Sequence, residues 1–446
     1  MRAVLVLLVL STAGAVAADE VEKKIAEAKR LARKYLIGMQ RRDGSWDLMR
    51  NQPCYRVGGT ALAIWALTAA GEPVESKSVR FGLRYLVERY RRQEKPDFGC
   101  VYNAACVLLG ILGYAQARSP HLMNMKDTLS ERLRGTWCTL PEEYQRLVRK
   151  AARYLADSQR GGWYYKGGYR EDTFVAQPWQ QRAACRPLDM SNTEWALFAL
   201  YLAARVGVPV PRKVFEDAAE WIMSVQERRG RRTARFPVPG VDLSVKRLRR
   251  MEKDALKKDG GGNALKALAE RGPLGGEVRR RRMYARGWGY QGGGVFGGQR
   301  ARSTGSMTAA AVSCLLACRY HLASSEWYDK SGRRLEEAIL DGLAHLSRNF
   351  RVGRNPGNRN NAYRVHYLFS LQHACRLALL EKIRGRDWFK EATSYFVRRQ
   401  RRSGCWDADR QLSSAVNTCF ALLFLSEAAH PLFDLRPRRG AAAPEK

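Results

Sequence analysis

The chain is poor in acidic residues, in long apolar runs and in closely paired cysteines. Its 446 residues include 43 Asp and Glu against 78 Lys and Arg, which gives a formal charge of +35. After the N-terminus no apolar run approaches the roughly 20 residues that a membrane-spanning helix needs. No two cysteines stand in a CxxC pair, the usual sign of a zinc knuckle. Alternating strand patterns are nearly absent, so the sequence favours a basic and mostly helical protein.

The N-terminus has the pattern of a secretory signal peptide over residues 1–17. Arg2 precedes an apolar run at residues 3–10, and the small residues at 15–17 suit cleavage. We therefore expect a protein that is exported to the periplasm or secreted. An ordinary N-terminal helix is the alternative. Export permits disulfides among the ten cysteines, although their spacing indicates no particular framework.

The excess of positive charge indicates a class of partner. A chain at +35 attracts polyanions such as nucleic acid, anionic polysaccharide and acidic lipid headgroups. Because the signal peptide argues against chromosomal DNA, we expect an anionic envelope polymer or membrane surface as partner and no specific nucleic acid. The alternative is a soluble protein that simply prefers arginine at exposed positions.

Pairs of helices repeat along the chain. Each pair has a charge-rich amphipathic helix, a glycine-rich turn that often contains tryptophan, and a second helix that is poor in charge. Between the second and third pairs, residues 118–140 are predicted to form a loop. The six predicted pairs are residues 21–39 with 58–70, 75–92 with 101–117, 142–158 with 191–206, 212–226 with 304–321, 333–350 with 361–380, and 386–400 with 412–428.

The two kinds of helix predict their places in the fold. A helix that is apolar nearly all round must be buried, whereas a helix with one apolar stripe covers it from outside. Six buried helices inside six amphipathic ones form an (α/α)6 toroid, and we predict this all-α fold for residues 19–430. An open solenoid of stacked pairs is the alternative. Residues 431–446 are rich in proline, alanine and arginine and predict a flexible tail.

A basic insertion at residues 228–286 interrupts the fourth pair. It holds 19 Lys and Arg against 6 Asp and Glu. Residues 242–258 predict a helix capped by Asp242, and the insertion as a whole predicts a solvated basic hairpin. Its only aromatic residues are Phe236 and Tyr284, too few to favour stacking on the bases of single-stranded nucleic acid.

A short sequence recurs at the turns. QRRDGSW at residues 40–46 and QRRSGCW at residues 400–406 are nearly identical, and shortened or split copies stand between them. We expect the glutamine to bond free carbonyls of its helix and N–H groups of the next helix, the glycine to permit the turn, and the tryptophan to fill the wedge between helices. The predicted structural joints contain Gln40, Gly44, Trp46, Gln159, Gly161, Trp163, Gln226, Trp288, Gln400, Gly404 and Trp406.

These joints resemble the QW motif of the terpenoid cyclase and protein prenyltransferase superfamily. In that motif an aromatic and apolar pair, such as Tyr35 and Leu36, precedes the glutamine, and Gly-x-Trp leads into an inner helix. The second copy keeps Gln93 but has Cys100 where the tryptophan would stand, and the fifth has only Phe350 at the glutamine position. The resemblance covers essentially the whole mature chain and implies the toroid of squalene cyclases, built from prenyltransferase and squalene oxidase repeats.

The catalytic groups that the resemblance implies are missing. Class II terpene cyclases protonate an alkene with an Asp-x-Asp-Asp motif at the start of an inner helix, but Gly58 and Gly59 stand where two of these acids are expected. The zinc ligands of protein prenyltransferases are matched only loosely, by His366, because the inner helix before it lacks the Asp-Gly-Cys pattern. We therefore expect no cofactor and no metal.

Polar residues at the starts of the inner helices remain as candidates, because in a toroid they face the central cavity. Asp189 or Glu194 is a candidate acid and His366 a candidate base. Helix capping and a polar mouth are the alternative explanation. Two functions follow. The first is a binding or scaffold domain whose basic surface engages an anionic polymer or membrane, and the second is an enzyme whose cavity takes an apolar isoprenoid or, by analogy of fold, an acidic polysaccharide.

Overall fold

Helices dominate the computed structural model of the chain, which describes residues 2–49, 52–119, 129–165, 188–257, 282–290, 302–407 and 411–427. Strands in these ranges are limited to two short antiparallel pairs. One joins β1 (Arg231–Thr233) to β2 (Met283–Ala285), and the other joins β3 (Lys382–Ile383) to β4 (Arg386–Asp387). The prediction of an all-α fold is confirmed.

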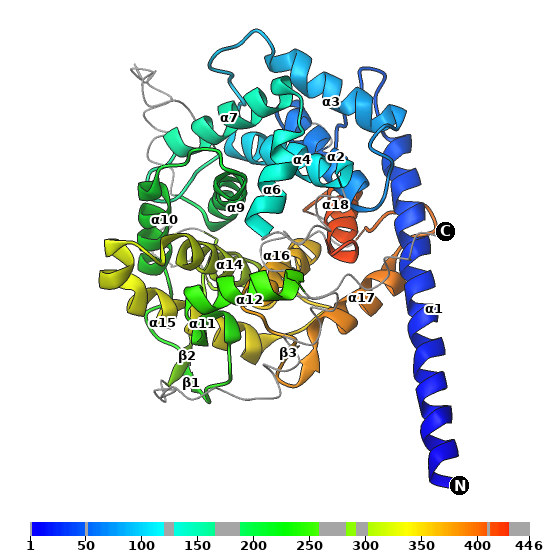
Figure 1. Ribbon diagram of the computed structural model, residues 1–446, viewed down its shortest axis with the longest axis vertical. Helices are drawn as coiled ribbons and strands as arrows, with labels where there is room; N and C mark the ends of the chain where they lie inside the picture. Colours follow the sequence, from blue (N-terminus) through cyan, green and yellow to red (C-terminus); the bar gives the residue numbers. More distant parts are fainter. Residues whose placement is uncertain are drawn as a thin grey trace.

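Six helices have almost entirely buried side chains, because their sequences are apolar nearly all round. Along the chain each packs on the next of the six, and the last, α18, packs on the first, α2. The contacts therefore make a closed circuit around the centre of the molecule (Figure 1). These inner helices are α2 (Arg56–Ala69), α4 (Val101–Arg118), α9 (Met190–Val206), α14 (Gly305–Leu322), α16 (Arg364–Leu377) and α18 (Ser414–Leu425).

Six outer helices alternate with the inner ones along the chain. Each buries one stripe: α7, for example, buries Leu147, Val148, Ala151 and Leu155 and turns its charged side chains outward. Each outer helix ends where the next inner helix begins, and we call this end of the molecule the joint end. The outer helices are α1 (Arg2–Gly38), α3 (Lys77–Tyr90), α7 (Glu142–Asp157), α10 (Arg212–Ser224), α15 (Glu326–Asn349) and α17 (Trp388–Arg399).

The first outer helix contains the predicted signal segment in its N-terminal part. Ala28, Ala32 and Leu36 of α1 are buried in contacts that include α17 and α18, while its N-terminal part projects away from the body (Figure 1). A short 3-10 helix, η1 (Pro53–Tyr55), leads into α2. None of the helices within the described ranges combines the length and apolarity that crossing a membrane requires.

Residues 118–140 are not a loop throughout, as the sequence predicts. They contain α6 (Leu129–Cys138), which packs on α4 and α9. The side chain of Arg134 lies against Gly207, the residue that ends α9. The helix escaped prediction because it is short and contains serine, glycine and threonine, which are weak helix formers.

The described part of the basic insertion, residues 228–257 and 282–286, is docked on the inner helices and is not solvated throughout, contrary to the sequence prediction. Its ends pair as β1 and β2, but Val238 and Leu248 between them are buried. Arg319 of α14, itself buried, donates hydrogen bonds of 2.9–3.1 Å to three carbonyls between Gly240 and Leu243. The prediction rested on the density of charge alone. It overlooked the apolar residues that are spaced between the arginines and that dock on the inner helices.

Two helices lie in the described part of the insertion: α11 (Pro239–Asp242) and α12 (Val245–Lys257). Arg249 of α12 donates a 3.1 Å hydrogen bond to the carbonyl of Tyr320 near the C-terminus of α14. Since α12 also packs on α6, these two helices, α12 and α6, lie together across the C-terminal ends of inner helices, opposite the joint end.

Asp242 does not cap the helix of the insertion. Its carboxylate accepts a 2.7 Å hydrogen bond from the N–H of Val238 and pairs with the guanidinium of Arg235. The cap is Ser244, whose hydroxyl accepts from the N–H of Arg247 at 3.3 Å. The helix begins later than predicted because Asp242 is the last residue of α11 and the backbone of Leu243 after it is extended.

Candidate functional site

Four tryptophans make the same contacts at four turns. Each is at most 1 % exposed, and each fills the wedge between an outer helix and an inner helix. The indole N–H groups of Trp46, Trp163, Trp288 and Trp406 donate hydrogen bonds of 2.7–2.8 Å to the carbonyls of Leu36, Leu155, Ile222 and Phe396, each on the preceding outer helix.

The four joint glutamines tie one outer helix to the next. Each amide donates one hydrogen bond inside its own turn and a second, of 2.6–3.1 Å, to a carbonyl on the following outer helix, which we call the glutamine latch. The amide nitrogens thus donate to carbonyls, which can each accept a second hydrogen bond, and the described residues show no bond from these glutamines to an N–H group of the next helix. The latches are Gln40 to Ser78, Gln159 to Val214, Gln226 to Ala338 and Gln400 to Ala28.

Each joint also contains a threonine that the sequence analysis missed. The backbone N–H of each joint tryptophan donates to a threonine hydroxyl one turn into the inner helix, at 2.9–3.2 Å. Aligning the inner helices on one another would have found this signal. The threonines are Thr60, Thr193, Thr308 and Thr418.

The joint glycines are required by the backbone. Gly44 has φ +85°, and a Cβ there would stand 2.5 Å from the carbonyl oxygen of Phe81. Gly161 and Gly404 have φ +91° and +90°. The glutamine, glycine, tryptophan and threonine of a joint are thus all engaged in holding helices together, which leaves none of them for chemistry.

The structure brings together two of the three sequence-predicted site residues. Glu194 of α9 and His366 of α16 face each other across the space between the inner helices, with a carboxylate oxygen 3.3 Å from Nε2. They are 2 % and 5 % exposed. Within the described ranges neither the Glu194 oxygens nor His366 Nε2 makes a hydrogen bond of good geometry. A buried acid and base left in this state mark a candidate functional pair.

Aromatic rings surround this pair and fill the space between the inner helices, the lumen. Trp195 stacks on Phe369 with ring centroids 6.1 Å apart, and Phe420 stacks on Phe369 at 5.0 Å and meets His366 at 5.5 Å. A cavity bordered by Glu194, Trp195 and Phe369 has about 10 Å³ for the centre of a water molecule, which is room for about one water. Beside Glu194 the predicted central cavity is therefore largely filled by aromatic rings.

Asp189, the third candidate, is a helix cap. Its carboxylate accepts hydrogen bonds of 2.8 Å from the backbone N–H and from the side-chain amide of Asn192, at the start of α9. Burial raises the pKa of Asp189 to about 6. The hydrogen bonds act in the opposite direction, because they favour the charged carboxylate. Capping, the alternative that the sequence left open, accounts for its position.

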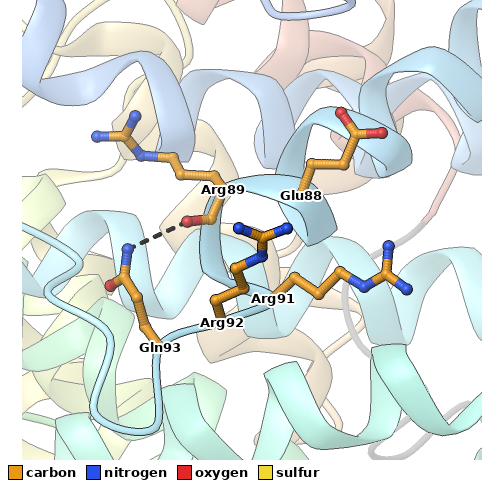
Figure 2. A pocket seen from close by; sticks show the side chains of 5 residues that line it. All are labelled: Glu88, Arg89, Arg91, Arg92 and Gln93. Atoms are coloured by element: carbon orange, nitrogen blue, oxygen red, sulfur yellow. Dashed lines mark hydrogen bonds between the residues drawn. The ribbon is translucent and has the colours of Figure 1, made fainter.

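The second turn lacks a latch. The amide of Gln93 donates back to the carbonyl of Arg89 in the last turn of α3 at 3.1 Å (Figure 2). Within the described residues it makes no hydrogen bond to α7. Phe98 is buried here and packs against Tyr154 with ring centroids 5.2 Å apart. The connection to α7 is made instead by Lys150, whose ammonium donates to the backbone carbonyl of Gln93.

An open hollow of about 700 Å³ lies at this turn and carries net positive charge. Its lining side chains are exposed, and three guanidinium groups stand there against one carboxylate (Figure 2). Such a site attracts anions. The lining residues are Glu88, Arg89, Arg91, Arg92 and Gln93.

Comparison of the chain with protein-family models and with curated proteins finds no match. Within the described ranges no three His, Cys, Asp or Glu side chains are grouped so as to hold a metal ion. The function is therefore inferred from the geometry.

Proposed function

We propose that the chain is an exported (α/α)6 toroid of the terpenoid cyclase and protein prenyltransferase type that serves as a scaffold for binding an anionic polymer. The closed circuit of inner helices supports the toroid. So does the latch from Gln400 to Ala28, which ties the last outer helix to the first. The resemblance of the joints supports the superfamily, and the N-terminal pattern supports export.

The contrast between lumen and surface carries this proposal. The cavity beside Trp195 and Phe369 in the lumen has room for about one water, which is too little for a lipid or a polymer. The hollow beside Gln93 is open to solvent and lined by three arginines. A chain at +35 with a filled centre and a cationic surface hollow is suited to binding from outside.

Arginine geometry specifies the ligand chemistry of the hollow. A guanidinium offers a planar fork of N–H donors that matches carboxylate, sulfate or phosphate oxygens. Because Arg89, Arg91 and Arg92 are exposed, each contact is screened by salt and contributes little alone. Affinity therefore requires several contacts at once, as on a polymer with repeating charges.

A triple variant tests the proposal. Replacement of Arg89, Arg91 and Arg92 by Gln should weaken binding to dextran sulfate about tenfold in low salt, since exposed charge contacts contribute roughly 0.5 kcal/mol each. Affinity is measured by titration at several salt concentrations. The matched control replaces Arg398, Arg399 and Arg402, which are equally exposed beside an intact joint. Equal weakening by both triples would show that binding follows net charge and that the hollow has no part in it.

The buried pair of Glu194 and His366 favours a second candidate function, catalysis or binding in the lumen. A carboxyl and an imidazole 3.3 Å apart among aromatic rings can exchange a proton with an apolar ligand such as an isoprenoid. Such a ligand enters only if Trp195 and Phe369 separate. Mass spectrometry of lipid extracted from the purified protein tests this function: the wild type should carry an apolar molecule that Glu194→Gln lacks, and empty wild-type protein counts against it.

A further inference from the structure

Six tyrosines gather at the joint end, where the inner helices begin. Tyr102 meets Tyr55 and Tyr165 with ring centroids 6.5 and 5.5 Å apart, and the hydroxyls of Tyr165 and Tyr290 are 2.8 Å apart. Each ring in the set is at least partly exposed, whereas tyrosines of the core are buried. The set, which we call the tyrosine mouth, is Tyr55, Tyr102, Tyr164, Tyr165, Tyr290 and Tyr363.

The backbone holds the mouth in place. The N–H of Val101 donates to the carbonyl of Tyr165 and that of Met190 donates to the carbonyl of Tyr290, both at 2.9 Å. These bonds fix the tyrosine-bearing segments to the first residues of α4 and α9. The hydroxyl of Tyr102 donates to Ser191 Oγ at 2.8 Å, and this hydrogen bond holds the ring of Tyr102 against the start of α9.

Tyr363 is held in a strained conformation at this mouth. It precedes α16 with φ +58° and ψ +32°, the left-handed region that residues other than glycine seldom adopt. Its side chain makes no capping hydrogen bond to the helix and is 41 % exposed. Tyr290 bonds the start of α9 and Tyr363 precedes α16, and both of these helices pack on α14, so the two exposed tyrosines lie at the same end of the molecule. A strained and exposed aromatic residue is typical of a binding site.

The rings are set at steep angles to one another. Neighbouring planes in the mouth meet at 67° and 77° and do not form the parallel platform on which successive bases stack. Phenol rings offer an apolar face and a hydroxyl, and a pyranose ring offers apolar C–H faces and a rim of hydroxyls. Exposed Arg302 and Arg359 precede α14 and α16 at the same end and add positive charge.

We propose that the tyrosine mouth binds the sugar rings of an acidic polysaccharide, a chain of pyranoses that carry carboxylates. This inference rests on the proposed function, because it names the anionic polymer that the basic surface engages. Tyrosine rings stack on the sugars, hydroxyls bond their rims, and the arginines around the mouth pair with carboxylates.

The test separates sugar recognition from charge. Tyr290→Ala and Tyr363→Asn are titrated with oligogalacturonate, with poly-glutamate of equal charge, and with single-stranded DNA; asparagine is chosen because it tolerates the left-handed backbone. Each variant should bind oligogalacturonate about tenfold more weakly and poly-glutamate unchanged, the loss expected for one aromatic contact. Tyr284→Ala, on β2 and 40 % exposed, is the matched control.

Three outcomes would overturn the inference: unchanged binding of oligogalacturonate, equal losses with poly-glutamate, or a larger loss with DNA, which would make the mouth a nucleic-acid site. The arginine triple variant distinguishes the two proposals. One result would contradict the proposed binding at the hollow and support the inference about the tyrosine mouth: that variant binds every polyanion as the wild type does, while the tyrosine variants lose only the sugar ligand. Circular dichroism of each variant confirms that the helices are retained.

Discussion

The side-chain amide of Gln400 donates a 2.8 Å hydrogen bond to the carbonyl of Ala28, across 372 positions of the sequence. The contact is the same as those that join consecutive outer helices, such as Gln159 to Val214. The two ends of the repeat are therefore bonded as neighbours.

Loss of that bond should cost stability. Gln400→Ala removes the donor to Ala28 and to Gly404, and we expect the free energy of unfolding in urea to fall by about 1–2 kcal/mol. Gln93→Ala is the control, because that amide is exposed and bonds only the helix that precedes it, α3, and no following outer helix. We expect its effect to stay within about 0.5 kcal/mol. Similar losses for both variants would contradict the structural role of the latch.

The joint threonine gives a second prediction. Thr60→Val leaves the buried N–H of Trp46 without an acceptor, so unfolding should be easier by about 1–3 kcal/mol. Thr68→Val lies in the same helix and removes a hydroxyl that only donates to carbonyls. It leaves no N–H unsatisfied and should cost at least about 1 kcal/mol less. Chemical denaturation of both variants is the measurement, and a larger loss for Thr68→Val would refute the assigned role.

The buried carboxyl of Asp189 makes a prediction about pH. Because burial raises its pKa to about 6 from 3.8, the folded state binds more protons than the unfolded state between these values. Stability contributed by this group therefore falls as pH rises from about 4 to 6 and is constant above, a loss of at most about 3 kcal/mol. Asp189→Asn, which can still cap the helix, should lack this fall. If the free energies of unfolding of the wild type and of Asp189→Asn changed with pH in the same way, the raised pKa of Asp189 would be ruled out.

Docking of the insertion depends on Arg319. Arg319→Met leaves three carbonyls between Gly240 and Leu243 without their donor and removes the ion pair with Glu336. We expect the segment around α12 to become sensitive to limited proteolysis, with an opening free energy lowered by about 2–4 kcal/mol. Arg250→Met, exposed on α12, is the control. A protease pattern like that of the wild type would mean that the apolar contacts suffice.

Much of the architecture could be predicted from the sequence, because burial follows from charge. Inner helices such as α14 carry almost no charge, whereas outer helices such as α7 have a charged face and an apolar stripe, so the places of both kinds were predictable. The joint glutamine and tryptophan were visible because they recur. The helix α6 and the docking of α12 were not, because the first has weak local signals and the second depends on Arg319, far away in the sequence.

The candidate site could be predicted only in part. The sequence locates Glu194 and His366 at the starts of two inner helices, but which helices face each other across the lumen depends on how the circuit closes. Whether the lumen is open depends on the packing of Trp195, Phe369 and Phe420, which no local pattern encodes. Asp189 shows the reverse case, since its cap position was predictable and its raised pKa was not.

The missing latches have a mechanical consequence. The turn after α3 has Gln93 folded back on that helix, and the turn after α15 has Phe350 under the guanidinium of Arg386. These two seams are three units apart in a circuit of six and lie on opposite sides of the body (Figure 1). The four latches therefore divide the outer layer into two stiff arcs, one running from α17 through α1 to α3 and the other from α7 through α10 to α15. We expect the body to bend first along the line between the seams, a hinge axis that passes over the lumen.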